Sequence, residues 1–75
     1  MVKFIDHYMF ATRIWKDSTP SPTVINLREL SHIDEMHDPN IGSHVAIFLN
    51  NGNAIPIEGD IIEVLAEFQR HLQTI

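Results

Sequence analysis

Residues 45–64 read VAIFLNNGNAIPIEGDIIEV, and this stretch predicts a β-hairpin followed by a helix. The apolar run at 45–49 predicts a strand, and Asn51-Gly52 is the strongest short-range hairpin signal, because a type I′ turn needs positive φ at both central residues. The chain then returns as a second strand over 53–57. Pro56 has no N–H for a ladder, so we expect this strand at a sheet edge or paired on one side only.

A helix is predicted over residues 60–74, directly after the hairpin. Asp60 is a suitable N-cap, and Glu63 follows three residues later as in a capping box. Apolar residues recur at helical spacing and should pack on the sheet as one face. They are Ile61, Val64, Leu65, Phe68, Leu72 and Ile75.

The segment 2–15 is predicted to be one strand, because it is rich in aromatic and β-branched residues and has no Gly or Pro. Its apolar side chains fall on both faces. Either the sheet curves around one core, or a second subunit covers one face. We interpret the larger side chains as candidate contacts with a partner or a second copy, namely Phe4, Tyr8 and Phe10 on one face, and Met9 and Trp15 on the other.

The middle of the chain supplies the remaining strands. Residues 16–22 contain two prolines and are predicted as a loop, and residues 23–37 as a strand whose apolar phase shifts at 28–30, as at a bend or bulge. A turn precedes the strand at 44–49. The whole chain, 1–75, is therefore predicted to be a single α+β domain, an antiparallel four- or five-stranded meander with one C-terminal amphipathic helix packed on it.

Composition narrows the class of protein. Ten acidic and five basic residues give a net charge of −5, which makes nucleic acid an unlikely partner because phosphate binding depends on Lys and Arg. No apolar run approaches the roughly 20 residues that span a bilayer, and Asp6 interrupts any signal-peptide core. The chain has no cysteine, so no disulfide bond can stabilise its small core. We expect a soluble cytoplasmic domain, away from membranes, that forms a homo-oligomer, most simply a dimer.

No catalytic or metal site is predicted, and the chain is interpreted as non-enzymatic and without a cofactor. Ser31, His32 and Asp34 are the residue types of a triad, but true triads converge from separate segments, so we interpret them as an exposed strand. His37 and His44 lie near His32 without the spacing of a metal site.

A small basic and aromatic cluster marks the end of the first strand. Arg13, Trp15 and Lys16 could bind a nucleotide-like ligand, with Arg28 as a further cation. The alternative is a packed tryptophan beside solvated charges. These four residues are the candidate ligand-binding set.

The pattern from residue 24 onward also carries a family resemblance. It consists of Val24-Ile25-Asn26-Leu27, Leu30, Ile33-Asp34-Glu35, the strand 45–49, Asn51-Gly52, Ile55-Pro56-Ile57 and the helix start at 60–64. This pattern resembles a group of small bacterial and phage proteins that includes the FlbD-type flagellar proteins, and it is similar to the strand–hairpin part of LytTR-type DNA-binding domains. The second resemblance implies a DNA-binding regulator.

Three functions are therefore expected, in order of preference. The first is a non-enzymatic interaction protein that regulates or inhibits a protein partner, as a phage or accessory-gene product would. The second is a nucleic-acid-binding regulator. The third is a binder of a small ligand, such as a nucleotide, at an oligomer interface.

Overall fold

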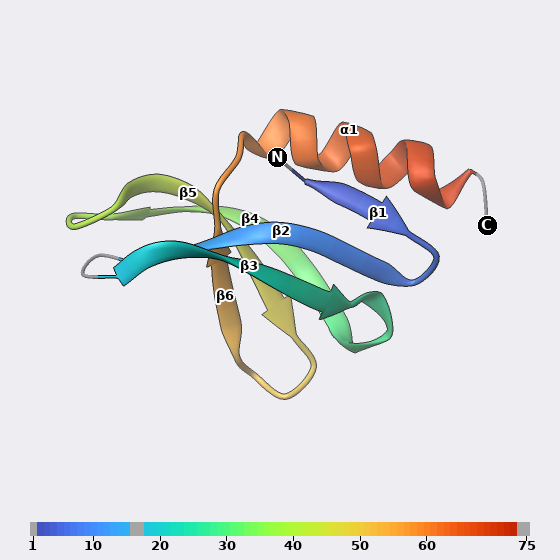
Figure 1. Ribbon diagram of the computed structural model, residues 1–75, viewed down its shortest axis with the longest axis horizontal. Helices are drawn as coiled ribbons and strands as arrows, with labels where there is room; N and C mark the ends of the chain where they lie inside the picture. Colours follow the sequence, from blue (N-terminus) through green and yellow to red (C-terminus); the bar gives the residue numbers. More distant parts are fainter. Residues whose placement is uncertain (1, 16–17, 74–75) are drawn as a thin grey trace.

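The computed structural model describes residues 2–15 and 18–73, and it shows an α+β fold (Figure 1). An antiparallel sheet of six strands is followed by one C-terminal helix. The predicted fold class is confirmed, with six strands where four or five were expected. The elements are β1 (Lys3–Ile5), β2 (Tyr8–Trp15), β3 (Ser18–Asn26), the 3-10 turn η1 (Leu27–Glu29), β4 (Leu30–Asp38), β5 (Gly42–Leu49), β6 (Ala54–Ile57) and α1 (Ile61–Leu72).

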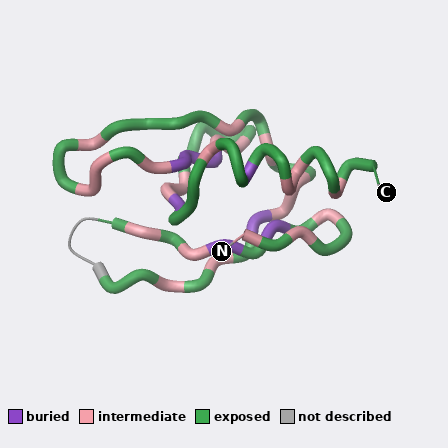
Figure 2. The backbone as a smooth tube through the Cα atoms, turned by 90° about the horizontal axis from the view of Figure 1, so that it is seen from above, coloured by how far each residue is buried: buried purple, intermediate pink, exposed green. Residues whose placement is uncertain are grey.

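The sheet is folded into two layers of consecutive antiparallel strands. One layer holds β1, β2 and β3, and the other holds β4, β5 and β6. The layers meet where β6 pairs with β2 at Ile57 and Arg13, next to a backbone hydrogen bond of 2.8 Å from Glu58 N to the Thr12 oxygen. Viewed from above, the buried residues lie between the two layers (Figure 2).

One core fills the space between the layers and α1. Its buried members come from both layers and from the helix: Met9, Ala11, Ile25, Val45, Ile47, Ile57 and Val64. Phe4 of β1 extends this core toward the helix, and its ring stacks on that of Phe68 with 5.4 Å between centroids. Curvature of the sheet therefore buries one face of the N-terminal strands.

The predicted single strand over 2–15 is wrong, because the chain turns at Asp6 and His7. Ile5 pairs with Tyr8, which leaves a two-residue turn between β1 and β2. Asp6 has φ of 54°, a left-handed conformation that Asp adopts more readily than most residues. His71 of α1 donates a hydrogen bond from Nε2 to the Asp6 carbonyl oxygen. The turn thus forms without Gly or Pro and is tied to the helix.

The predicted loop at 16–22 is also wrong over most of its length, because β3 begins at Ser18. Residues 16 and 17 lie outside the described residues. Pro20 and Pro22 fit within β3 because this strand pairs only with β2 among the described strands, and an edge strand tolerates a missing N–H. The predicted strand 23–37 is divided by η1, which produces the expected shift of phase.

The hairpin between β5 and β6 differs from a type I′ turn. Gly52 N donates to the Leu49 oxygen at 3.0 Å, and Leu49 N donates to the Asn53 oxygen at 2.9 Å. Gly52 has φ of 90°, whereas Asn51 is not in the positive-φ region. This pattern is that of a three-residue loop with a glycine bulge. Strand β6 lies between β2 and β5 rather than at an edge, although Pro56 itself pairs only with β5.

The helix begins as predicted. The Asp60 side chain accepts hydrogen bonds from Ile62 N at 2.7 Å and Glu63 N at 3.3 Å, so it is the N-cap of α1. The described helix ends at Leu72, within the predicted range of 60–74. No helix in the described part of the chain is long and apolar enough to cross a membrane.

The predicted apolar face of α1 is only partly covered by the sheet. Val64 is buried, but Leu65 is 42% and Leu72 is 52% exposed. Ile75 lies outside the described residues. The helix therefore covers one end of the core with fewer of its apolar side chains than the sequence pattern predicted.

Candidate functional site

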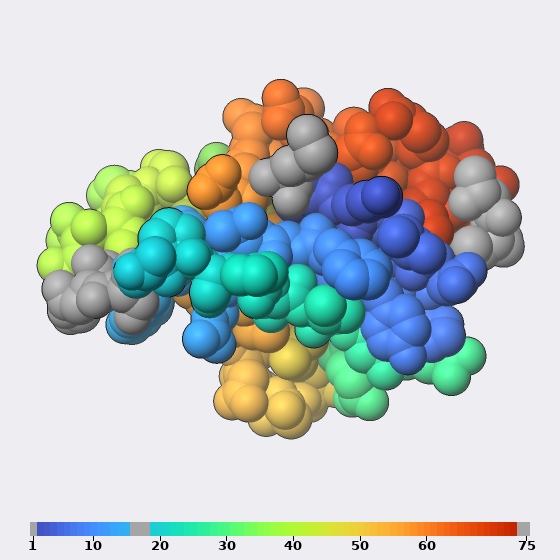
Figure 3. Space-filling model, in the orientation of Figure 1, coloured from blue at the N-terminus to red at the C-terminus, as the bar shows by residue number. Residues whose placement is uncertain are grey.

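An exposed apolar patch covers the outer face of the first layer. In antiparallel strands, directly paired residues project to the same face. Ile5 pairs with Tyr8, and Phe10 pairs with Val24, so these four side chains share the face turned away from the core. We call them the outer patch. The segments that carry it lie side by side on one face of the molecule, in dark blue, blue and teal (Figure 3).

The outer patch is accessible and free of negative charge. Its members are between 39% exposed, at Phe10, and 56% exposed, at Val24. The other outward positions of the paired rows are Lys3, Thr12, Pro22 and Asn26. None of the ten acidic residues of the chain occupies this set of positions. Protein interfaces are depleted of charge at their centres, and this face has that character.

The five predicted contact residues are separated by the structure. Tyr8 and Phe10 lie in the outer patch. Met9 is fully buried in the core, and Phe4 is occupied by its stack on Phe68 and by a second stack on the His71 ring at 5.6 Å. Met9 and Phe4 are therefore corrected to core positions, because alternate residues of a strand project to opposite faces. The fifth, Trp15, is 52% exposed but lies at the far end of β2.

Sequence reasoning missed Val24 and Ile5 as members of this patch. Both belong to it through strand pairing, which no local pattern in the sequence reveals. The hydrophobic character of Val24 was visible, but its position opposite Phe10 depends on the register of β2 and β3.

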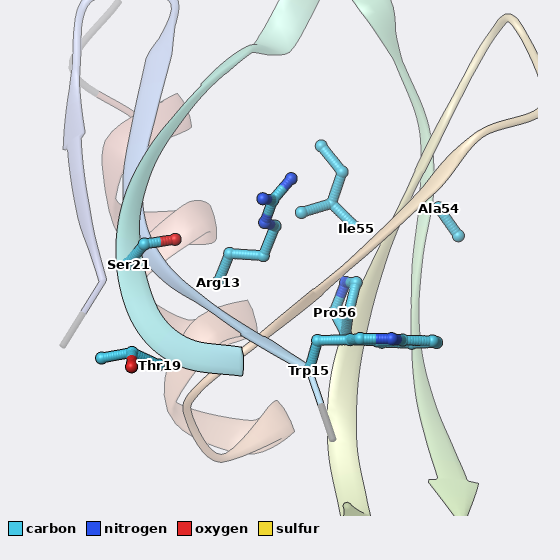
Figure 4. Close-up of a pocket in the computed structure, with 7 residues that line it drawn as sticks. All are labelled: Arg13, Trp15, Thr19, Ser21, Ala54, Ile55 and Pro56. Atoms are coloured by element: carbon cyan, nitrogen blue, oxygen red, sulfur yellow. The ribbon is translucent and has the colours of Figure 1, made fainter. Parts of the chain in front are cut away.

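A second feature is a hollow of about 320 Å³ between the β2–β3 hairpin and β6. We call it the basic hollow. It is lined by Arg13, Trp15, Thr19, Ser21, Ala54, Ile55 and Pro56. The Arg13 side chain reaches toward Ile55, the Ser21 side chain points toward Arg13, and the Trp15 indole lies beside Pro56 (Figure 4).

A β-bulge helps to shape the basic hollow. The register between β2 and β3 shifts between Arg13 and Trp15. Bulges change the direction of neighbouring side chains and are common beside binding sites. The Arg13 side chain forms no ion pair or hydrogen bond with another residue that the structure describes. The hollow therefore contains a cation that is not neutralised by the described part of the protein.

The four predicted ligand-binding residues are not all brought together. Arg13 and Trp15 both line the basic hollow. Arg28 belongs to η1 and does not line it, and Lys16 lies outside the described residues. The hollow lies beside the N-terminal end of β3, where Thr19 and Ser21 line it, whereas η1 follows the C-terminal end of that strand. Arg28 is therefore not part of this site.

The structure does bring Ser31, His32 and Asp34 together. Ser31 Oγ lies 3.1 Å from His32 Nδ1, and His32 Nε2 lies 3.5 Å from Asp34 Oδ2. The His32 ring stacks on Phe48 at 4.3 Å between centroids and is half exposed. Neither the basic hollow nor the two hollows beside α1 include these residues. The group is a polar row on β4 that lines none of these three hollows.

The remaining histidines form no metal site within the described ranges, where no group of three or more His, Asp or Glu side chains could hold an ion. His44 Nδ1 lies 3.0 Å from the Gly42 oxygen, and His37 Nδ1 lies 3.4 Å from Ser43 Oγ. Both histidines thus contact the first residues of β5.

Comparison of the chain with protein-family models, with curated proteins and with solved structures found no match. The two candidate sites, the outer patch and the basic hollow, therefore rest on their own geometry.

Proposed function

We propose that this protein is a non-enzymatic interaction module that forms a homodimer through the outer patch. The observation that carries the proposal is the exposure of Ile5, Tyr8, Phe10 and Val24 on one continuous sheet face. Exposed apolar side chains that adjoin one another favour association, because burying them removes apolar surface from water. In this form the protein would regulate or inhibit a protein partner.

A second copy is the occupant that the charges favour. The chain has a net charge of −5, so most of its surface repels another copy. The outward positions of the first layer carry Lys3 and no carboxylate, which makes this face the one where two copies approach with little repulsion. A two-fold axis would place the same patch on both sides of the contact.

The surface area of the protein is also large enough for a specific dimer interface. A typical specific interface buries about 800 Å² on each partner, or about a sixth of the 5077 Å² surface of this protein. The outer patch supplies the apolar centre of such a contact. Lys3 and Asn26, at the ends of the paired rows, would belong to its polar rim.

Sedimentation velocity on the full chain tests the proposal. The wild-type protein is expected to sediment as a species of twice 8.6 kDa at micromolar concentration. Val24→Lys places a charge opposite Phe10 and is expected to shift the protein to the monomer, because burying an unpaired ammonium group is costly.

Met36→Lys is the matched control. Met36 is 44% exposed on β4, in the other layer, so the same chemical change should leave the dimer intact. A wild-type monomer at all concentrations, or equal effects of the two substitutions, would contradict the proposal.

A further inference from the structure

The basic hollow has the chemical character of a small-ligand site. Its volume of about 320 Å³ is at the lower end of the range for ligand pockets, which is about 300–1,000 Å³. Apolar side chains from β6 form one wall, and the polar side chains of Arg13 and Ser21 converge from β2 and β3. Apolar walls with a few converging polar groups are the usual composition of such sites.

Charge selects the class of ligand. Among the residues that the structure describes, no acidic side chain lines the basic hollow, and the Arg13 side chain has no partner. A guanidinium group binds carboxylate or phosphate with paired hydrogen bonds. In a protein with twice as many acidic as basic residues, an arginine left without a carboxylate in a hollow indicates an anionic ligand.

Trp15 indicates a second property of the ligand, a flat aromatic group. Trp15 is 52% exposed and lies in the same hollow as Arg13. Indole rings stack on flat aromatic groups, as they do on the bases of nucleic acids. Ser21, opposite Arg13 on β3, adds a hydroxyl group that can donate to an anionic oxygen.

We propose that the basic hollow binds a small anion that carries an aromatic ring. The ring stacks on Trp15, and the anionic group binds Arg13 and Ser21. A nucleoside monophosphate and an aromatic carboxylate share this chemistry, and the size of the hollow suits either one better than a dinucleotide. The site is separate from the outer patch, so this proposal does not depend on the dimer.

The protein contains a single tryptophan, which gives a direct readout of the site. The indole N–H of Trp15 produces one resolved cross-peak in a ¹H–¹⁵N correlation spectrum. Titration of the labelled full chain at low salt compares adenosine monophosphate with adenosine, and benzoate with benzamide. We expect a saturable shift of this peak with at least one of the two anions and a weaker response to its neutral counterpart.

Two arginine variants make the test specific. Arg13→Gln is expected to raise the dissociation constant of the responding anion by about tenfold or more, because hydrogen bonds between charged groups are the stronger ones. Arg28→Gln changes the net charge equally but lies outside the hollow, so it should bind as the wild type does. The rest of the spectrum reports whether each variant remains folded.

The two anions identify the source of the ligand. A response to the phosphate alone assigns the site to nucleotides, and a response to the carboxylate alone assigns it to aromatic acids. The proposal is overturned if neither anion moves the Trp15 peak at millimolar concentration. It is also overturned if the neutral counterparts bind as tightly, or if Arg28→Gln weakens binding as much as Arg13→Gln does.

Discussion

Substitution of Met9 and of its neighbour Phe10 should have opposite consequences. Met9 is fully buried in the core, whereas Phe10 is 39% exposed in the outer patch. Truncation of a buried Met to Ala typically costs about 2–5 kcal/mol. A domain of 75 residues is expected to have a total stability of roughly 4–11 kcal/mol. Met9→Ala should therefore remove a large part of the folding free energy.

Phe10→Thr replaces an outward aromatic ring with a β-branched side chain, and both residue types favour strands. It loses a cross-strand pair with Val24, which contributes about 0.2–1 kcal/mol. Its effect on the unfolding of the monomer should therefore be below about 1 kcal/mol. Self-association should respond in the opposite way, because Phe10→Thr removes apolar area from the proposed interface and Met9→Ala does not.

Urea denaturation followed by circular dichroism measures the free energy of unfolding of each variant, and sedimentation measures its self-association. Denaturation is carried out at the lowest usable protein concentration, where linkage to the dimer contributes least. The melting temperature of Met9→Ala should fall by roughly 10 °C or more, since 1 kcal/mol corresponds to about 4–8 °C in a domain of this size. Equal loss of stability in the two variants would refute the assignment of Met9 to the core and of Phe10 to the surface.

The other predictions concern local backbone features and are measured by urea denaturation. Asp60→Ala should cost about 1 kcal/mol by removing the N-cap of α1, whereas Asp60→Ser should retain most of the stability; equal losses would contradict the capping role. Asp6→Val should cost about 1–2 kcal/mol because φ at this position is 54°, while Asp6→Gly should be nearly neutral; a neutral Asp6→Val would exclude the left-handed turn. Gly59→Ala should cost about 1–3 kcal/mol because φ is 142°, a conformation that residues with a Cβ rarely adopt, whereas the added Cβ itself would lie at ordinary contact distance, 3.4 Å, from Val64 Cγ2; unchanged stability would show that the backbone relaxes there.

The C-terminal part of the fold was predictable because its signals are local. The Asp60 cap depends on hydrogen bonds to residues two and three positions further along the chain. The hairpin before it was located correctly from Asn51-Gly52, although its turn type was not. The helical face was predicted too wide, because periodicity shows which residues are apolar but not how many of them the sheet reaches. Leu65 remains exposed for this reason.

The N-terminal part was predictable only in its apolar character. The turn at Asp6 lacks Gly and Pro, and its contact with His71 joins residues far apart in the sequence. Strand β3 includes Pro20 and Pro22, which in isolation indicate a loop. Edge position permits them there, and edge position is a property of the assembled sheet.

In the candidate sites too, the features that depend on local sequence were predictable and those that depend on long-range strand pairing were not. Arg13 and Trp15, which are close in sequence and lie on one strand, line the same hollow. Ile55, which the Arg13 side chain approaches, comes from β6 through the pairing of the two layers. The partnership of Phe10 with Val24 likewise depends on strand register. Long-range pairing therefore accounts for most of what the sequence did not predict.

Mapping of the self-association surface by dilution shows directly whether two copies meet through the outer patch. Amide chemical shifts of the labelled wild-type protein are compared between millimolar and low micromolar concentration. We predict changes concentrated in β1, β2 and the second half of β3, centred on Phe10 and Val24, with β4 and α1 nearly unaffected. Changes centred on α1 or β4, or no change with concentration in a protein that sediments as a monomer, would contradict the assignment of the outer patch as the interface.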